Sequence, residues 1–300
     1  MNFYPISLSF TAASSFALGI FVIYKNPRNR VNFTWGIACI CCGGWSFFMV
    51  LSLFSPSQDA ANVFIKALNI SAAYMAVFVA DFCKEITGVN KAKKRLINFG
   101  YFFSALITLS AFTDFFCSVS TKIQAFTYFT QAGPLYPLFT AHFFLYAFYA
   151  GYLLIRGLQI ANTEKKNQIK YILVGLTLGY IGGSITFLPA YGVKIDPFPA
   201  HFVWLYAAII SYAILKHHLM DIEIVIKRTV FYSLFVFVLS VLYIGIVFGV
   251  HHLLMEGGAH SNFLDSFNST LWFSLPPLIG TFIFLTLGFI FLFHKPQTSQ

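Results

Sequence analysis

Charged side chains are scarce in this sequence. Only 10% of its 300 residues are Asp, Glu, Lys or Arg, and only ten residues are acidic, whereas a soluble domain carries about 25% charged residues. Hydrophobic residues make up 58% of the chain and include 38 phenylalanines, and the mean hydropathy is +0.74. This composition excludes an ordinary soluble domain and indicates a protein whose main solvent is lipid.

Cysteines are few, and their spacing does not suit a metal site. Cys39, Cys41 and Cys42 crowd one apolar run, while Cys83 and Cys117 stand alone. A zinc site would need further thiol or imidazole ligands at short spacing, and none follows these cysteines. We therefore expect no metal site and no cofactor, and we interpret the cysteines as small buried apolar side chains.

Long polar segments are also missing, so we expect no soluble domain, no long linker and no low-complexity tract. The N-terminus has no Lys or Arg before its first apolar run, which therefore stays as a membrane span and is not a signal peptide.

What the sequence does contain is nine apolar runs, each near the roughly 20 residues that a helix needs to cross the bilayer core. The runs are continuous, which favours helices over the alternating strands of a barrel. The expected spans are residues 6–24, 31–54, 60–86, 96–112, 136–158, 168–188, 198–215, 229–250 and 271–293. The predicted fold class is all-α: a polytopic helical membrane protein with about nine transmembrane helices.

The basic residues lie mostly on one side of this arrangement. Sixteen of the nineteen Lys and Arg residues follow spans one, three, five, seven and nine, whereas Lys66, Lys122 and Lys194 fall on the other side. The positive-inside rule then places the N-terminus outside and the C-terminus in the cytoplasm. Membrane topology therefore accounts for the net charge of +9, and we expect a lipid bilayer and no nucleic acid as partner.

The sixth span carries a row of glycines. Gly175, Gly179 and Gly183 recur every four residues, so they share one helix face and allow a neighbouring helix to approach closely. We expect this face to serve helix packing, with a hinge as the alternative. Pro189 is expected to end the helix on the outer side.

Two ionisable residues fall within the third span. Lys66 lies near its outer end and Asp81 near its inner end, about 22 Å apart along a helix, so they cannot pair. Each is expected to extend toward its nearer interface. The alternative for Asp81 is an ion pair with a cytoplasmic Lys or Arg, such as Lys84 on the same helix.

A few polar and aromatic side chains toward the outer ends of the expected spans are candidates for a ligand pocket. His142, Tyr146 and Tyr149 share one face of the fifth span by their spacing. The alternative is an aromatic belt at the membrane interface, where Tyr and Trp are enriched. The candidate ligand-binding residues are Lys66, His142, Tyr146, Tyr149, His201 and Trp204, with Tyr136 and Tyr191 near them.

The most specific indication of a protein family is the segment YAILKHHLMDIEIVIKRTVFYSLF, residues 212–235. It resembles the junction in bacterial sensor histidine kinases that begin with the histidine kinase N-terminal seven-transmembrane region. The stretch IYKNPRNRVNFTWGIACICCGGWSF, residues 23–47, and the last two helices, residues 168–215, are similar to that family as well. The resemblance implies a seven-transmembrane sensor region over residues 1–228, and two further helices with a short cytoplasmic tail over residues 229–300.

The resemblance also implies a role in two-component signal transduction. A family member would lie in the bacterial cytoplasmic membrane and act as a receptor that works as a homodimer or through a separate kinase or response regulator. The 300 residues hold no phospho-accepting His followed by Glu, no Asn-box and no Gly-rich ATP lid. We therefore expect a sensory input module without enzyme activity on this chain, which is a truncated product, a fragment or a free-standing receptor.

The charged turn between spans seven and eight is the expected signal-coupling hinge, with a purely topogenic turn as the alternative. Its polar residues are Lys216, His217, His218, Asp221, Glu223, Lys227 and Arg228. Lys227 and Arg228 can contact anionic lipid head groups.

Two other classes of function are alternatives to a sensory input module. A small-molecule transporter or channel is the main alternative, although we find no internal repeat and nine spans do not divide into equal halves. A membrane enzyme would need clustered His, Asp, Glu or Cys on facing helix ends. His217 and His218 are adjacent, so their side chains diverge by about 100° around a helix and form no metal motif.

Overall fold

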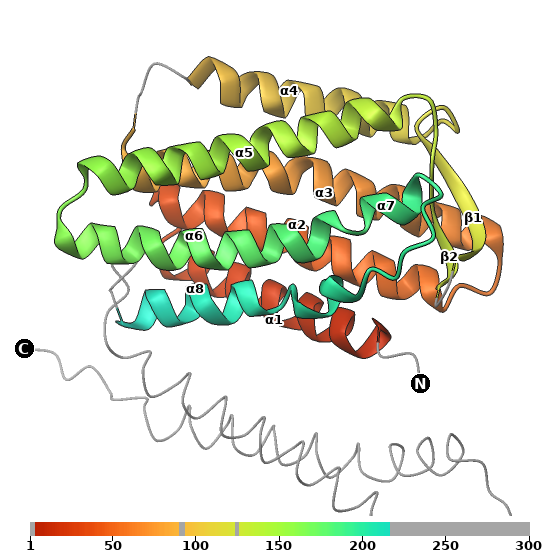
Figure 1. Ribbon diagram of the computed structural model, residues 1–300, viewed down its shortest axis with the longest axis horizontal. Helices are drawn as coiled ribbons and strands as arrows, with labels where there is room; N and C mark the ends of the chain where they lie inside the picture. Colours follow the sequence, from red (N-terminus) through yellow and green to blue (C-terminus); the bar gives the residue numbers. More distant parts are fainter. Residues whose placement is uncertain (1–3, 90–93, 124–125, 217–300) are drawn as a thin grey trace, which may run out of the picture. The chain divides into compact units, whose positions relative to one another are not determined.

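The computed structural model describes residues 4–89, 94–123 and 126–216. These residues form a bundle of helices with one β-hairpin (Figure 1). The elements are α1 (Tyr4–Lys25), α2 (Arg30–Leu53), α3 (Gln58–Thr87), α4 (Lys94–Ala111), β1 (Cys117–Ile123), β2 (Phe126–Ala132), α5 (Tyr136–Ile160), α6 (Thr163–Ser184), α7 (Phe187–Ala190), the 3-10 helix η2 (Phe198–Phe202) and α8 (Leu205–Lys216).

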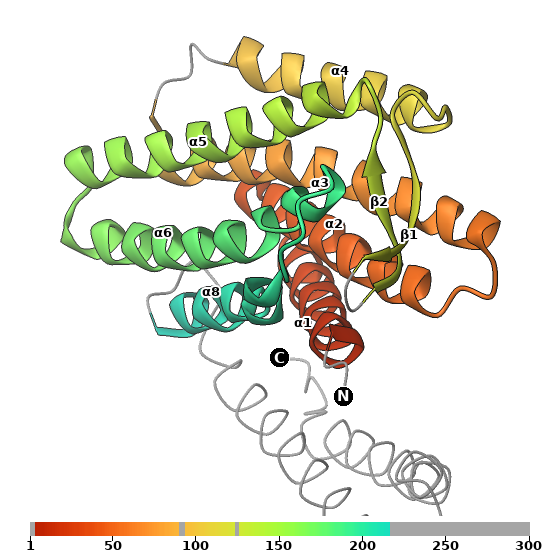
Figure 2. The same ribbon diagram turned by 45° about the vertical axis from the view of Figure 1, so that its right-hand side comes forward.

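The helices stack with α4 at one edge of the bundle and α1 and α8 at the opposite edge, as Figures 1 and 2 both show. Helix α2 packs between α1 and α3, and α5 packs on α3 and α6. The largest buried side chains of the centre are aromatic and include Trp35, Tyr146 and Phe82. Because α2 and α3 meet most of the other long helices, a change in their spacing affects the whole bundle.

Short polar connections set where the helices begin and end. The side-chain oxygen of Asn29 accepts a hydrogen bond from the backbone N–H of Val31 at 2.9 Å and caps α2. Ser57 caps α3 in the same way, and Gly88 ends that helix in a left-handed conformation with φ of 65°, which glycine adopts without steric strain. These caps fix the connections at the two ends of the bundle.

Five helical segments are long and apolar enough to cross a membrane: α1, α2, α3, α5 and the segment from Thr163 to Ala190 that contains α6 and α7. They correspond to expected spans one, two, three, five and six. The fourth expected span is α4, with 18 residues, and the seventh is divided between η2 and α8. Expected spans 229–250 and 271–293 lie outside the described residues.

The sixth and seventh spans are interrupted where the sequence analysis predicted continuous helices. Helix α6 ends at Ser184, five residues before Pro189, so the prediction that Pro189 ends this helix is wrong. The run of Gly182, Gly183 and Ser184 has poor helix propensity, and the Thr186 hydroxyl donates to the backbone carbonyl of Gly183 at 2.6 Å. In the seventh span, Pro199 lacks a backbone N–H, and an irregular turn precedes α8.

The purely all-α prediction also needs correction, because an antiparallel hairpin joins α4 to α5. Its register pairs Cys117 with Ala132 and Ser120 with Phe129. The two strands are rich in β-branched and aromatic residues such as Val119 and Tyr128, which favour extended backbone. The predicted loop between spans four and five is therefore an ordered element.

The glycine row of α6 divides into two parts. A Cβ atom at Gly175 would lie 3.2 Å from Cγ1 of Ile210, and one at Gly179 would lie 3.2 Å from Cβ of Tyr206, so both glycines face α8 closely. The third close approach belongs to Gly182, which faces Pro199 and Val203. Gly183 has open space where a Cβ would lie, so it does not serve helix packing as the sequence analysis predicted.

Candidate functional site

A cavity of about 70 Å³ lies inside the bundle. Its walls come from α2, α3, β2, α5, α6, α7 and α8, so it joins segments that lie far apart in the described chain. A space of this volume exceeds what one water molecule needs, which is roughly 10 to 15 Å³. The cavity is therefore a candidate ligand site.

Apolar and aromatic side chains dominate the cavity wall, and no charged residue lines it. Helix α2 contributes Trp35, Trp45 and Met49, and α5 contributes Phe139 and Phe143. Such a lining, with a small number of polar groups, is typical of sites for small molecules.

The polar groups on one side of the cavity are paired with one another. The Tyr136 hydroxyl donates to Oδ1 of Asn69 at 3.0 Å, and Nδ2 of Asn69 donates to the Thr130 hydroxyl at 3.3 Å. Asn69 lies in α3, Thr130 in β2 and Tyr136 in α5, so this network holds the hairpin against two helices. The Tyr206 hydroxyl, which lines another part of the wall, donates to the Ser15 hydroxyl at 2.8 Å.

Two lining groups differ from these. Within the described part of the chain, Nε1 of Trp35 and the hydroxyl of Tyr180 are buried without a hydrogen-bond partner. Trp35 is only 1% exposed, and its indole nitrogen can only donate. A buried donor without an acceptor is unfavourable by about 1 to 3 kcal/mol, so these two groups are unsatisfied polar atoms among the residues of the cavity wall.

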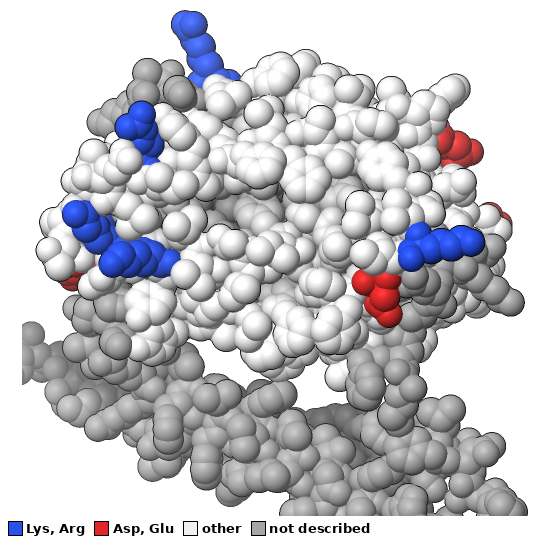
Figure 3. All heavy atoms as spheres, viewed as in Figure 1, with Lys and Arg blue, Asp and Glu red and all other residues white. Residues whose placement is uncertain are grey.

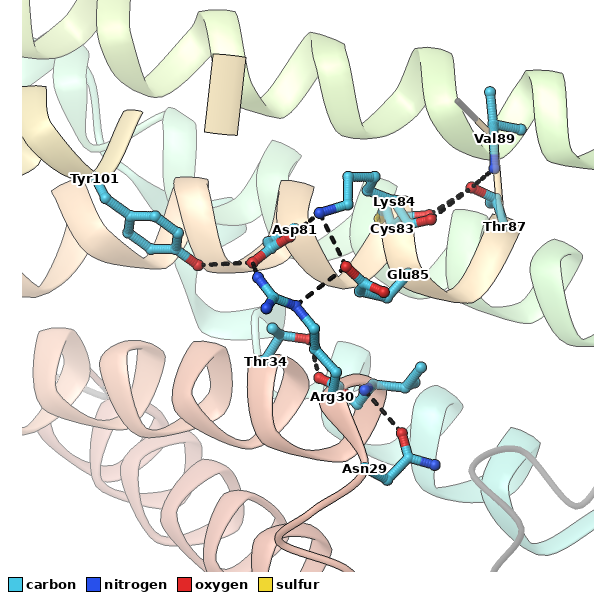
Figure 4. A network of polar contacts seen from close by, with 11 residues as sticks. Asn29, Arg30, Thr34, Asp81, Cys83, Lys84, Glu85, Thr87, Val89 and Tyr101 are labelled. Atoms are coloured by element: carbon cyan, nitrogen blue, oxygen red, sulfur yellow. Dashed lines mark hydrogen bonds and ion pairs between the residues drawn. The ribbon is translucent and has the colours of Figure 1, made fainter. Parts of the chain in front are cut away.

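A network of charged side chains lies where the start of α2 meets the C-terminal part of α3 (Figure 4). Asp81, only 1% exposed, accepts from Arg30 at 3.2 Å and from Lys84 at 2.8 Å. Glu85 pairs with Arg30 at 3.1 Å and with Lys84 at 2.9 Å, and the Tyr101 hydroxyl donates to Asp81 at 3.2 Å. The network balances two positive and two negative charges and ties α2, α3 and α4 together.

The structure decides between the two alternatives for Asp81. Its carboxylate pairs with Lys84, as local helix spacing suggested. Lys66 extends toward the hairpin end of α3, where its Nζ lies 3.6 Å from Asp114. The sequence analysis left a cytoplasmic Arg open as a partner but named neither Arg30 nor Tyr101, because both come from other helices and carry no signal in the local sequence.

His142, Tyr146 and Tyr149 do share a face of α5, but this face does not line the cavity. Nε2 of His142 lies 3.0 Å from the Ser104 hydroxyl of α4, and the Tyr146 hydroxyl donates to the Leu96 carbonyl at 2.6 Å. The adjacent face of α5, with Tyr136, faces the cavity instead. His142 and Tyr146 therefore join α5 to α4.

His201 and Trp204 lie against α1. Nδ1 of His201 is 2.7 Å from the Ser7 hydroxyl, and its ring stacks on Tyr4 at 4.1 Å between centroids. Trp204 meets Phe10 edge to face at 5.4 Å. Five of the six candidate ligand-binding residues thus fall into separate contacts with Asp114, α4 and α1, and none of the six lines the cavity. Their role as ligand contacts remains a prediction without support from this placement.

The sequence gives only weak indications that the residues of the cavity wall form a site. Trp35 lies in a stretch that resembles the sensor family, and Asn69 is an uncharged polar residue in the middle of a predicted span. Of the predicted hinge, Lys216 is the last residue of α8, while His217, His218, Asp221, Glu223, Lys227 and Arg228 lie outside the described residues.

Comparison with known proteins gives one match. The family model described as "N-terminal 7TM region of histidine kinase" matches residues 7–223. Neither the curated proteins nor the solved structures contain a match to the chain. The matched range includes α2 with Trp35 and Arg30, and α3 with Asn69 and Asp81, so the cavity and the charged network both lie within it.

Proposed function

This chain belongs to the family of N-terminal 7TM regions of histidine kinases, and on that premise we propose that it is the membrane-embedded sensory input module of a signalling system. The family match over residues 7–223 carries the proposal. A stimulus acts within the helical bundle, and the response leaves through α8 toward the predicted hinge at residues 216–228. The kinase activity belongs to a partner or to a longer product.

The charge distribution supports an orientation with the N-terminus outside and the C-terminus in the cytoplasm of a bacterium. Figure 3 shows Lys and Arg gathered mainly at the end of the bundle where α5 connects to α6, with a broad uncharged surface between the two ends. Residues such as Arg28, Arg95 and Lys166 lie at or beside the α1–α2, α3–α4 and α5–α6 connections. By the positive-inside rule these connections face the cytoplasm, and the hairpin faces outward.

The cavity and the charged network share α2 and α3, which supports the transmission of a stimulus from the bundle to its cytoplasmic end. Met75 lines the cavity and Asp81 follows it on α3 by about 9 Å of helix rise. On α2, Trp35 lines the cavity about 1.4 turns after Arg30. A molecule that alters the spacing of α2 and α3 therefore also alters the geometry of the Arg30–Asp81 pair.

The output of a fused kinase tests this function. The full chain is joined at its C-terminus to the dimerisation and ATP-binding domains of a histidine kinase with a known response regulator. We expect Asp81→Asn to change the steady-state phosphorylation of that regulator several-fold, because it breaks the charged network. Lys166→Gln is the control, since Lys166 is exposed and lies in the first turn of α6.

Equal phosphorylation by the wild type and the Asp81→Asn fusion, at equal amounts in the membrane, contradicts a sensory role for the bundle. Solute uptake by the unfused chain in vesicles would favour the transporter alternative.

A further inference from the structure

We propose that the cavity binds one very small, uncharged, apolar solute of the bilayer, of the size of xenon or propane. This proposal rests on the proposed function for its biological meaning, because it names the chemical class of the stimulus. The argument depends on the volume of the cavity, on the lack of charge in its wall, and on the hydrogen bonds that its polar groups already make.

The volume of the cavity sets the size of its occupant. Protein interiors leave few voids larger than a water molecule, and this cavity has about 70 Å³. A molecule of liquid water takes about 30 Å³, and an apolar cavity of about 150 Å³ binds benzene or xenon. The space therefore suits about two or three non-hydrogen atoms and is too small for a benzene ring.

The uncharged wall excludes ions. Within the described residues, no Lys, Arg, His, Asp or Glu lines the cavity. Moving an isolated carboxylate or ammonium from water into such a wall is strongly unfavourable. The solute is therefore neutral.

The polar groups of the wall leave little for water to bind. The hydroxyls of Tyr136, Tyr206 and Thr186 donate hydrogen bonds within the protein, and Asn69 pairs with both Tyr136 and Thr130. A buried water makes about three hydrogen bonds, which this wall does not offer. Water therefore occupies the cavity less favourably than an apolar solute does.

The apolar part of the wall supplies the attraction. Met49, Phe139 and Phe143 line the cavity, and wall atoms that face an empty space lose dispersion contacts. An apolar solute restores these contacts without the loss of any hydrogen bond. Such solutes also leave water for an apolar environment, so the hydrocarbon core of the bilayer concentrates them around the bundle.

Gly183 provides a way to fill the cavity by mutation. It lines the cavity together with Leu176, Gly179 and Tyr180, and their spacing places all four on one face of α6. A Cβ atom built on Gly183 has no neighbour within 4 Å, so Gly183→Leu adds a side chain of four carbons in open space. Gly151 is a matched control, because its Cβ also meets open space in a helix and it does not line the cavity.

Binding of xenon to the purified full chain in lipid nanodiscs tests the proposal. Xenon NMR measures the bound gas, and nanodiscs without protein give the signal of xenon in lipid alone. We expect one xenon per wild-type protein at saturation. Propane and ethanol each have three non-hydrogen atoms, and propane should displace this xenon at an at least tenfold lower free concentration, roughly the factor that burying an unpaired hydroxyl would add.

Two variants change the volume of the cavity in opposite directions. Gly183→Leu should reduce bound xenon by at least about tenfold, while Gly151→Leu should bind it as the wild type does. Met49→Ala removes three non-hydrogen atoms from the wall and brings the volume closer to the roughly 150 Å³ that accepts benzene. Benzene should therefore displace xenon from Met49→Ala and leave the wild type unaffected. Circular dichroism confirms that each variant keeps its helices.

The proposal is overturned if the wild type binds no xenon beyond the lipid signal, or if a helical Gly183→Leu binds as much as the wild type. Displacement by ethanol as effective as that by propane would contradict an apolar site, and displacement by benzene from the wild type would contradict its size. These results would overturn this inference only, since the phosphorylation test with Asp81→Asn needs no ligand.

Discussion

The indole ring of Trp35 packs against the phenyl ring of Phe82, with 4.8 Å between the ring centroids. Trp35 lines the cavity, and Phe82 is the immediate neighbour of Asp81, the centre of the charged network. This contact connects α2 to α3 at the level between the two sites. A ligand that moves the indole ring therefore acts on the helix segment that holds the Asp81 carboxylate.

The charged network should contribute to stability mainly through Asp81. Asp81→Asn keeps the volume but leaves Arg30 and Lys84 with Glu85 as the remaining carboxylate. Removing one partner of a buried ion pair is strongly destabilising, but the Arg30 side chain is 54% exposed, so we expect a loss of about 2 kcal/mol in the free energy of unfolding. Thermal unfolding in nanodiscs measures it. Asp59→Asn, in the exposed first turn of the same helix, should lose less than about 1 kcal/mol, and an equal loss would argue against the network.

The contact between α4 and α5 should tolerate no added methyl group at Gly100. A Cβ there would lie 2.5 Å from Cζ of Tyr146, whose ring is fully buried and whose hydroxyl is bonded to Leu96. We expect Gly100→Ala to destabilise the protein by about 1 to 3 kcal/mol. Gly151→Ala meets open space and should be neutral or stabilising by up to about 1 kcal/mol. Unfolding curves that order the two variants the other way would show that α4 does not pack on Tyr146.

The hairpin should be held in place by Asn69. Asn69→Ala removes the partner of both the Thr130 and the Tyr136 hydroxyl, a loss of about 1 to 3 kcal/mol. We expect the backbone amides of β2 to exchange with deuterium about tenfold faster, since local opening becomes easier. Gln131→Ala, on the exposed face of the same strand, is the control. Unchanged exchange in Asn69→Ala would mean that the hairpin is anchored by other contacts.

The thiol of Cys117 in β1 should react slowly with alkylating reagents. Burial raises its pKa from an ordinary value near 9 to about 12, and the nearby Lys66 opposes this only in part. Because the thiolate is the reactive form, labelling by N-ethylmaleimide should be slow at pH 8 and should accelerate as the pH rises toward 12. Thr113→Cys, at an exposed position before the strand, provides a fast reference in a Cys117→Ser background. Equal labelling rates at pH 8 would show that Cys117 is accessible and its pKa ordinary.

The sequence predicted most of the helices because each begins or ends at a polar or glycine-containing connection, such as Asn29 or Gly88. It also offered the pairing of Asp81 with Lys84 as an alternative to extension toward the interface, because that pairing needs only local helix geometry. Arg30 and Tyr101 could not be assigned to the same network, because their contact with Asp81 depends on how α2 and α4 pack against α3.

The dependence on helix packing also explains why the candidate ligand-binding residues do not line the cavity. Helix periodicity placed His142 and Tyr146 on one face but gave no information on whether that face meets α4 or the cavity. The hairpin was missed because hydropathy identifies spans and overlooks short strands. The early end of α6 depends on the weak helix propensity of Gly182 and Gly183, which the search for apolar runs did not weigh.

The most direct test of the sensory account is the phosphorylation output of the fused kinase when the cavity is filled. The account predicts that Gly183→Leu shifts steady-state phosphorylation of the response regulator several-fold, because the cavity and the charged network share α2 and α3, while Gly151→Leu matches the wild type. Equal output from all three proteins, at equal amounts in the membrane, would contradict a coupling between the cavity and the cytoplasmic side.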